Sequence, residues 1–372
     1  MTAPSRRDPA DSSGSSLLYT AARALVRAAL RLTFRRIDVH GRASVPARGP
    51  LLVVANHHNG AVDPALIGIS LGRPLRLTAK STLQKVPLLD TVFRAFGVIP
   101  IHRQRDQAEG ADPSRNEASL DAIIDGLGAG AAIALFPEGI SHDGPGLLRF
   151  KHGAAHVALA AAERHPKGPV WVLPCGIGYG SKSRLRGSAE LRYGQPLDAA
   201  RWRREHPQAS PGELTAVLRA RVAELLPRPR RTRTVAGRWR RAAEAAGLVI
   251  GLPALACLGP ALLASSWVTR RMSPDRHSDP SWQVFSLAAL MPLSAILGLV
   301  GLWLTGGWPA AVAAVGLLPL TWPALLLGVD ALSDLSRRGR SPRLGALPRA
   351  FALHFRERRL PRAPRRRPVT AE

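Results

Sequence analysis

The chain has 372 residues, enough for one full α/β domain and further elements, and its formal net charge is +26, from 52 basic against 26 acidic residues. An excess of this size indicates a polyanionic partner such as nucleic acid, anionic lipid or acidic substrates, although part of the arginine excess reflects coding bias. Two cysteines, Cys175 and Cys257, are too few and too far apart for a disulfide framework or a zinc site. Composition therefore predicts a reducing compartment and no metal.

The first residues, 1–14, are rich in Pro, Ser, Asp and Arg and predict a disordered leader without a signal peptide, so we expect the following domain to stay cytosolic. Beyond this leader, four arginines recur at every fourth position: Arg23, Arg27, Arg31 and Arg35. On a helix over 15–39 they form a basic stripe, which is typical of an amphipathic helix lying on an anionic membrane surface. A surface helix packed on the domain is the alternative.

Residues 40–227 alternate short apolar runs with helical segments, which predicts an α/β domain with a mixed sheet covered by helices. The expected strands are 51–54, 75–79, 98–102, 132–136, 170–173 and 190–193. One helix start is well marked, because Ser210-Pro211-Gly212-Glu213 has the pattern of a capping box with proline at the first helical position.

A second region follows an arginine-rich linker, 228–244, after which the charges vanish. No charged residue occurs in 245–269 or in the 49 residues of 281–329, a length sufficient for two spans joined at Gly306-Gly307-Trp308-Pro309. Tryptophans near the ends of these runs are typical of membrane interfaces. We therefore predict membrane-embedded helices over 245–330; a buried helical hairpin of a soluble protein is the alternative.

The basic tail, 331–372, contains twelve arginines, and the positive-inside rule places it in the cytosol together with the α/β domain. An even number of crossings follows, which favours a two-span hairpin over 281–329 and a re-entrant or interfacial segment over 246–269. Three straight spans would place the tail on the other side. The expectation is an integral protein of the cytoplasmic (inner) membrane with its catalytic domain facing the cytosol.

Candidate catalytic side chains directly follow the apolar run 51–54. His57 and His58 precede Asp63 by six and five positions, and a histidine with an aspartate is the minimum needed to activate a hydroxyl nucleophile. Arg103 and Glu138-Gly139 end two further apolar runs, where an α/β sheet gathers its ligand groups.

Four blocks carry a resemblance to a known family. They are Asn56-His57-His58-Asn59-Gly60-Ala61-Val62-Asp63, Gly97-Val98-Ile99-Pro100-Ile101-His102-Arg103, Phe136-Pro137-Glu138-Gly139-Ile140-Ser141 and Val172-Leu173-Pro174-Cys175-Gly176. Their order and spacing, over roughly residues 40–200, resemble the glycerolipid acyltransferases, the bacterial 1-acylglycerol-3-phosphate acyltransferases and their relatives. Most members space His and Asp as His58 and Asp63 are spaced; a sub-branch with Asn-His-x-Asn-x-x-x-Asp-Pro matches His57. We favour His57, and both assignments stay open.

The resemblance implies a glycerol-phosphate acyltransferase-like fold and a role for each residue. The histidine would act as general base on an acceptor hydroxyl while Asp63 fixes its tautomer, with no covalent acyl-enzyme and no cofactor. Arg103 would bind the acceptor phosphate, Glu138 and Gly139 would help hold the glycerol phosphate end, and Lys151 would be a second phosphate contact.

Cys175 in the fourth block and His142, directly after the third, are two further candidates. Cys175 lacks a base partner in the sequence, so we expect it to shape the acyl site and not to act as a nucleophile. His142 is equally compatible with a surface loop and with a functional role.

The predicted activity is transfer of a fatty acyl group from acyl-CoA or acyl carrier protein to a hydroxyl of a glycerol-phosphate lipid, with lysophosphatidate to phosphatidate as the leading case. Glycerol 3-phosphate, another lysophospholipid or lyso-ornithine lipid are alternative acceptors. The alternative from a different class is a non-catalytic basic membrane tether. With aromatic residues at 5% and no recognised nucleic-acid motif, the expected partners are membrane lipids and the two substrates, and no nucleic acid. The oligomeric state is not indicated.

Overall fold

The computed structural model describes residues 13–80, 98–101, 114–142, 144, 146–166, 168–180, 186–227, 252–272 and 279–338. Several sequence predictions lie outside these ranges. They are most of the leader, Arg103, the linker 228–244 and the tail beyond residue 338.

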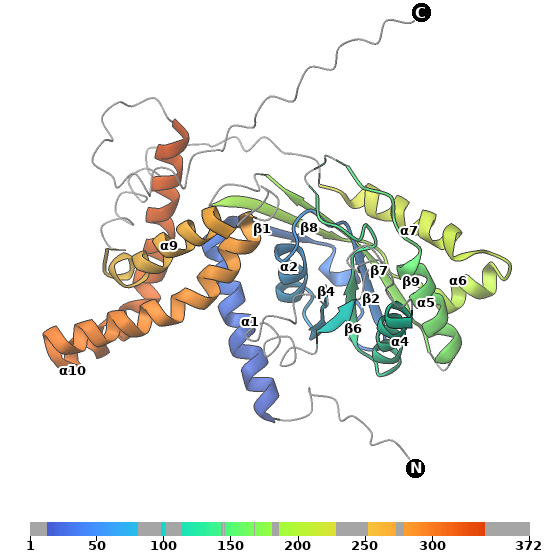
Figure 1. Ribbon diagram of the computed structural model, residues 1–372, viewed down its shortest axis with the longest axis horizontal. Coiled ribbons are helices and arrows are strands. Elements are labelled where there is room, and N and C mark those ends of the chain that lie inside the picture. Colours follow the sequence, from blue (N-terminus) through green and yellow to red (C-terminus); the bar gives the residue numbers. More distant parts are fainter. Residues whose placement is uncertain are drawn as a thin grey trace, which may run out of the picture.

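The domain is built on a seven-stranded mixed sheet in the order β1-β8-β7-β2-β6-β3, with β9 paired to β7 (Figure 1). Its strands are β1 (Phe34–His40), β2 (Leu51–Ala55), β3 (Leu75–Arg76), β6 (Ala132–Leu135), β7 (Trp171–Tyr179), β8 (Gly187–Tyr193) and β9 (Leu197–Asp198). Strand β7 pairs antiparallel with β8 and β9, and the other pairings are parallel. Two short strands, β4 (Thr78–Lys80) and β5 (Ile99–Ile101), form a separate parallel pair.

Helices cover both faces of the sheet, which confirms the predicted fold class. Every residue of β2 is buried, as expected of a central strand between two helical layers. One face packs against α1 (Ser13–Thr33), α2 (Val62–Ser70), α9 (Leu252–Met272) and α10 (Asp279–Arg338). The other face packs against α4 (Ser114–Gly128), α5 (Gly153–Arg164), α6 (Ala199–Glu205) and α7 (Pro211–Leu225). A short 3-10 helix, η2 (Arg42–Ser44), follows β1.

The N-terminal helix is shorter than the predicted 15–39, because it ends at Thr33 and Phe34–His40 form β1. This strand pairs in parallel with β8, so a partner far along the chain overrides the local four-residue period. Arg35, the fourth member of the predicted stripe, consequently lies in the strand.

Two arginines of α1 contact the protein itself. Arg23 and Arg27 both donate to the carbonyl oxygen of Ile69, in the last turn of α2, over 3.2 Å and 3.3 Å. Helix α1 therefore packs against the domain along this part of the stripe, and its contact with a membrane surface stays a prediction.

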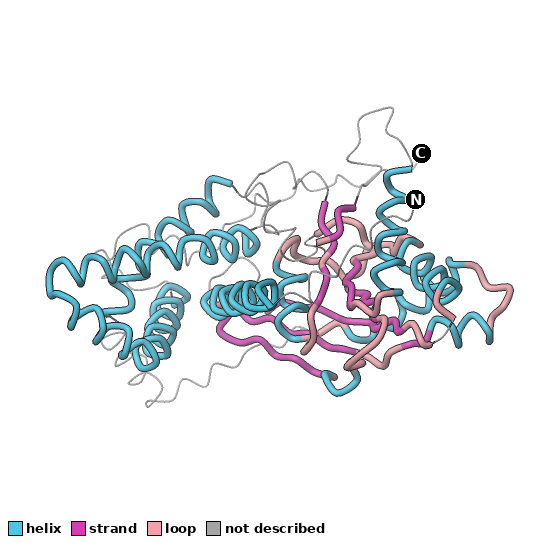
Figure 2. Tube along the Cα trace, turned by 90° about the horizontal axis from the view of Figure 1, so that it is seen from below, coloured by secondary structure: helices cyan, strands magenta, loops and turns pink. Residues whose placement is uncertain are grey.

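The C-terminal apolar region forms α9 and α10 (Figure 2). Helix α10 is interrupted at Gly307, with φ 70° and ψ −177°, where the sequence predicts the joint between two spans. In the described residues, one helical segment is long and apolar enough to cross a membrane, Ser286–Ala313, with a mean hydropathy of 2.1. Large exposed hydrophobic side chains gather on these helices; they are Leu263, Trp267, Leu293, Ile296, Leu297, Val300, Trp303, Leu304, Trp308, Val312 and Val315.

Candidate active site

His57 and Asp63 meet where β2 gives way to α2. Strand β2 ends at Ala55 and α2 begins at Val62, so Asp63 lies in the first turn of the helix. The Nδ1 atom of His57 is 3.0 Å from Oδ2 of Asp63. The aspartate side chain is fully buried and that of His57 is 8% exposed, so the pair is shielded from most of the solvent. Of the two candidate histidines, His57 therefore makes the predicted contact with Asp63, and the roles of base and orienting carboxylate stay predictions.

The Asp63 carboxylate accepts two further hydrogen bonds. The backbone N–H of Asn59 donates to Oδ2 over 2.6 Å, and the hydroxyl of Tyr179 donates to Oδ1. Burial, followed by the charge of Asp63, raises the pKa of Tyr179 well above its ordinary value, so the phenol keeps its proton and can donate. A buried carboxylate needs such donors because it has lost its hydration.

The imidazole of His57 is held on a second side by an aromatic ring. It stacks on Phe136, with ring centroids 4.2 Å apart and an angle of 21° between the planes. Since Nδ1 faces the carboxylate, it carries the proton of a neutral ring, and Nε2 is then the atom able to accept a proton.

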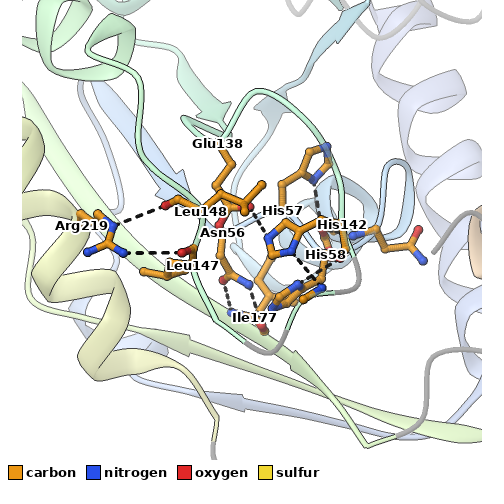
Figure 3. A network of polar contacts seen from close by, with 12 residues as sticks. Asn56, His57, His58, Glu138, His142, Leu147, Leu148, Ile177 and Arg219 are labelled. Atoms are coloured by element: carbon orange, nitrogen blue, oxygen red, sulfur yellow. Dashed lines mark hydrogen bonds and ion pairs between the residues drawn. The ribbon is translucent and has the colours of Figure 1, made fainter. Parts of the chain in front are cut away.

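The two asparagines of this block act as structural supports. In Figure 3, Asn56 reaches strand β7: its Nδ2 donates to the carbonyl oxygen of Ile177 over 2.9 Å, and the Ile177 N–H donates back to Oδ1 over 2.7 Å. The side chain thereby continues the β2–β7 pairing beyond Ala55. The side-chain oxygen of Asn59 accepts from the Val62 N–H at the start of α2, over 3.3 Å.

His58 turns toward a different partner. Its Nδ1 lies 3.3 Å from the carbonyl oxygen of His142, and the two imidazole rings have centroids 4.9 Å apart. The candidate that the structure joins to Asp63 at hydrogen-bond distance is thus His57, and His58 borders the same site on the side of His142.

Glu138 and Gly139 lie in a turn directly after β6, and the side chain of Lys151 lies beside this turn. Gly139 adopts a φ of 74°, which favours glycine, and its N–H donates to the Phe136 carbonyl over 3.0 Å. Lys151 crosses this turn, because a Cβ on Gly139 would lie 3.1 Å from its Nζ. The structure therefore brings these three predicted residues to the side of the site where Phe136 stacks on His57. Arg103 is outside the described part, which includes β5 up to Ile101, two residues earlier.

Cys175 is buried in β7, and burial, with the charge of Asp63 as the second cause, raises the pKa of its thiol well above the ordinary value. A protonated, buried thiol is a poor nucleophile, in agreement with the sequence argument.

Sequence reasoning missed Tyr179, although a period of two places it on the same side of β7 as Cys175 and Ile177. The sequence feature that could have indicated Tyr179 is its position as an aromatic residue at the end of β7, the strand that begins with the fourth block. The spacing of residues in the sequence does not indicate that Phe136 stacks on His57.

Comparison with known proteins finds matches to the part of the chain that carries this site. Residues 36–178 match the family model described as Acyltransferase. A 1-acyl-sn-glycerol-3-phosphate acyltransferase of Borreliella burgdorferi is 28% identical over 38% of this chain and 54% of its own length. A lyso-ornithine lipid O-acyltransferase of Rhizobium meliloti is 28% identical over 46% of this chain and 54% of its own length. The chain therefore spans about half the length of these curated relatives.

One solved structure also overlaps with the chain. A 1-acyl-sn-glycerophosphate (LPA) acyltransferase from Thermotoga maritima superposes with a TM-score of 0.45 and 21% identity, covering 59% of this chain and 82% of the other. Residues 36–178 therefore match an acyltransferase domain and are similar to the corresponding part of these relatives.

Proposed function

We propose that the chain is a membrane-bound O-acyltransferase that moves a fatty acyl group from acyl-CoA or acyl carrier protein to a hydroxyl of a glycerol-phosphate lipid. Lysophosphatidate, giving phosphatidate, is the leading acceptor. The observation that carries this proposal is the buried His57–Asp63 pair, whose carboxylate also accepts from Tyr179 and Asn59, inside the matched family domain.

The chemistry follows from the pair. Nε2 of His57 takes the proton from the acceptor hydroxyl as its oxygen attacks the thioester carbonyl carbon. The tetrahedral intermediate then collapses, the carbon–sulfur bond breaks, and the departing sulfur receives the proton from the imidazolium. Asp63 stabilises the imidazolium in between, because the carboxylate lies 3.0 Å from Nδ1. No covalent bond to the protein forms.

The phosphate end of the acceptor is assigned to the two cations predicted for it, Arg103 and Lys151, since a guanidinium and an ammonium both pair with phosphate. Lys151 is exposed and lies over Gly139, so its ammonium is accessible to a substrate. Glu138 is fully buried, and its negative charge would repel a phosphate, so we assign it a supporting role at this turn.

Location at a bilayer suits both the lyso-lipid and the product. The apolar segment Ser286–Ala313 and the exposed hydrophobic side chains of α9 and α10 support insertion, and the basic residues beside them support binding to anionic lipid. We propose the inner membrane, with the domain on the cytosolic side. Carbonate extraction of membranes tests insertion: the chain is expected to stay in the pellet, and release into the supernatant would contradict it.

The two relatives described above do not decide which acceptor this chain uses. They are equally identical to it in sequence, and their names give different acceptors. Glycerol 3-phosphate and other lysophospholipids compete for the same assignment. Acceptor choice depends on pocket walls, and small differences there change the discrimination between substrates by about 1–3 kcal/mol.

The test is acyl transfer in membranes that contain the chain. Labelled acyl-CoA and acyl carrier protein are offered with lysophosphatidate, glycerol 3-phosphate, lysophosphatidylcholine or lyso-ornithine lipid as acceptor. The expected result is labelled phosphatidate that disappears in Asp63→Asn, while Asp121→Asn, an exposed aspartate on α4, behaves as wild type. Transfer to none of the acceptors would instead favour the non-catalytic basic tether.

A further inference from the structure

The loop that follows β6, residues 136–142, ends on a residue that contacts both histidines of the first block (Figure 3). The backbone N–H of His142 donates to the carbonyl oxygen of His57 over 3.2 Å. Its carbonyl oxygen lies 3.3 Å from Nδ1 of His58. One residue of this loop thereby fixes the backbone of His57 and the ring of His58.

The ring of His142 is itself oriented. The N–H of Gly144 donates to its Nδ1 over 3.1 Å, so a neutral imidazole carries its proton on Nε2. That Nε2 lies 2.7 Å from Oε2 of Glu138. The ring therefore points its N–H side at a carboxylate from the same loop.

The contact with His142 should stabilise the carboxylate of Glu138. Its side chain is fully buried, and in the described part of the chain neither carboxylate oxygen has an aligned hydrogen-bond donor. The distance to His142 is that of an ion pair, although the N–H is not aligned as in a full hydrogen bond. Since removing one partner of a buried pair leaves an uncompensated charge, the two residues should behave as a unit.

We propose that His142 is a positioning residue for the general base: Glu138 orients its ring, and its backbone holds His57 and His58 so that Nε2 of His57 stays at the acceptor hydroxyl. The inference rests on the proposed function. It assigns Glu138 to the support of the base, through His142, and not to the acceptor. Displacement of a base by about 1 Å costs on the order of 10²-fold in rate, which is the scale expected here.

The experiment is a double-mutant cycle on Glu138→Ala and His142→Ala, with acyl transfer to lysophosphatidate as the readout. Each single change is expected to lower kcat by roughly 10- to 100-fold with little change in the KM for the acceptor. The double variant should be no slower than the worse single one, because both changes break the same unit. Glu138→Gln should recover most of the rate, since its amide oxygen can still accept from Nε2.

The controls separate this proposal from its alternatives. His156→Ala removes an exposed histidine of α5 and should keep wild-type kinetics. A rise in the acceptor KM at unchanged kcat would contradict the proposal and would indicate that Glu138 binds the acceptor. Losses that multiply in the double variant would also contradict it. If wild type transfers acyl groups and Asp63→Asn does not, while His142→Ala keeps full kcat, the positioning role fails and the proposed function stands.

Hydrogen exchange supplies a readout that does not depend on activity. In Glu138→Ala, the amide of residue 142 and the amides of 56–63 should exchange faster than in wild type, because the loop is no longer tied by its buried pair. Glu117→Ala, on the exposed side of α4, should leave both segments unchanged. Unchanged protection in Glu138→Ala would overturn the proposed unit even if no acceptor were ever labelled.

Discussion

The carboxylate of Asp63 contacts three groups from two segments: His57 and the backbone N–H of Asn59 in the turn between β2 and α2, and the hydroxyl of Tyr179 on β7. Each donor lowers the free energy of the charged form and limits the rotation of the side chain. The position of His57 is therefore set from both β2 and β7. The proposed function of His57 as a base depends on this support as much as on the imidazole itself.

Removal of one donor should alter the base in a measurable way. Tyr179→Phe keeps the ring beside Phe34, at a centroid distance of 5.8 Å, and deletes only the hydroxyl. The remaining carboxylate charge is less dispersed, so it holds the imidazolium of His57 more tightly. The acidic limb of the pH–rate profile should move to higher pH, with a loss of rate on the order of 10-fold near neutral pH.

Tyr193→Phe is the matched control, because its hydroxyl bonds to Ser70 and not to Asp63. Its acidic limb should coincide with that of wild type. An unchanged limb in Tyr179→Phe would show that the hydroxyl does not contribute to the behaviour of the base.

At the scale of elements, one buried arginine connects α1 to the sheet. Arg186 has a φ of 64°, and its guanidinium donates to the carbonyl oxygens of Arg31, Leu32 and Phe34. Its own N–H donates to the carbonyl of Thr33 over 2.7 Å. The last carbonyls of a helix lack partners within it and favour a nearby cation, so Arg186 stabilises the end of α1.

Arg186→Met retains apolar volume and removes these donors, which leaves several buried carbonyls without them. We expect a loss of about 2–4 kcal/mol in the free energy of unfolding, measured by denaturant titration in detergent. Arg164→Met, which breaks an exposed pair with Asp121, serves as comparison and should change little. Equal stability of the two variants would argue against the capping role.

Short sequence patterns correctly predicted elements that are stabilised by contacts between residues close in sequence. The apolar run 51–54 corresponds to β2 (Leu51–Ala55), and the predicted capping box is present, with Glu213 accepting from the Ser210 N–H over 3.0 Å. Strand β1 could not be predicted, because its pairing with β8 joins Phe34 to Gly187 across the domain. The periodic arginines there fit a helix as well as the strand that forms.

In the candidate site, too, contacts between residues close in sequence could be predicted and contacts between distant residues could not. Spacing alone identified a histidine and Asp63 but left two histidines open, since the choice depends on the turn between β2 and α2. The contacts of His142 and Tyr179 come from segments about 80 and 120 residues away in sequence. No periodicity reports such contacts, and only the sheet order brings them together.

At the scale of the whole molecule, the apolar C-terminal helices share a core with the domain. Leu262 of α9 and Leu287 of α10 belong to the same buried cluster as Leu30 of α1 and Leu66 of α2. The middle of α10, around the kink at Gly307, is the exposed apolar part, and Trp308 there is 70% exposed. Helix α2, which carries Asp63, thus packs in the core that also holds the proposed membrane anchor.

Global stability should fall at alkaline pH, because burial raises the pKa of both Cys175 and Tyr179. The unfolded chain releases these protons above about pH 8.5 and about pH 10, and the folded chain retains them. The unfolded state then binds fewer protons, so stability decreases with rising pH, by about 1.4 kcal/mol per pH unit for each group. Unfolding titrations from pH 8 to 11 measure this slope.

In Cys175→Ala, the contribution that begins near pH 8.5 should be absent, although the variant is less stable overall. A slope identical to that of wild type between pH 9 and 10 would show that the thiol does not carry a raised pKa in the folded protein.

The most direct test of the account compares His57→Ala with His58→Ala in acyl transfer to lysophosphatidate by membranes containing each variant at equal amount. We predict that His57→Ala loses roughly 10²–10⁴-fold in rate, the usual contribution of a general base, and that His58→Ala stays within about 10-fold of wild type. Full activity in His57→Ala, or loss confined to His58→Ala, would contradict the assignment of the base to the histidine that contacts Asp63.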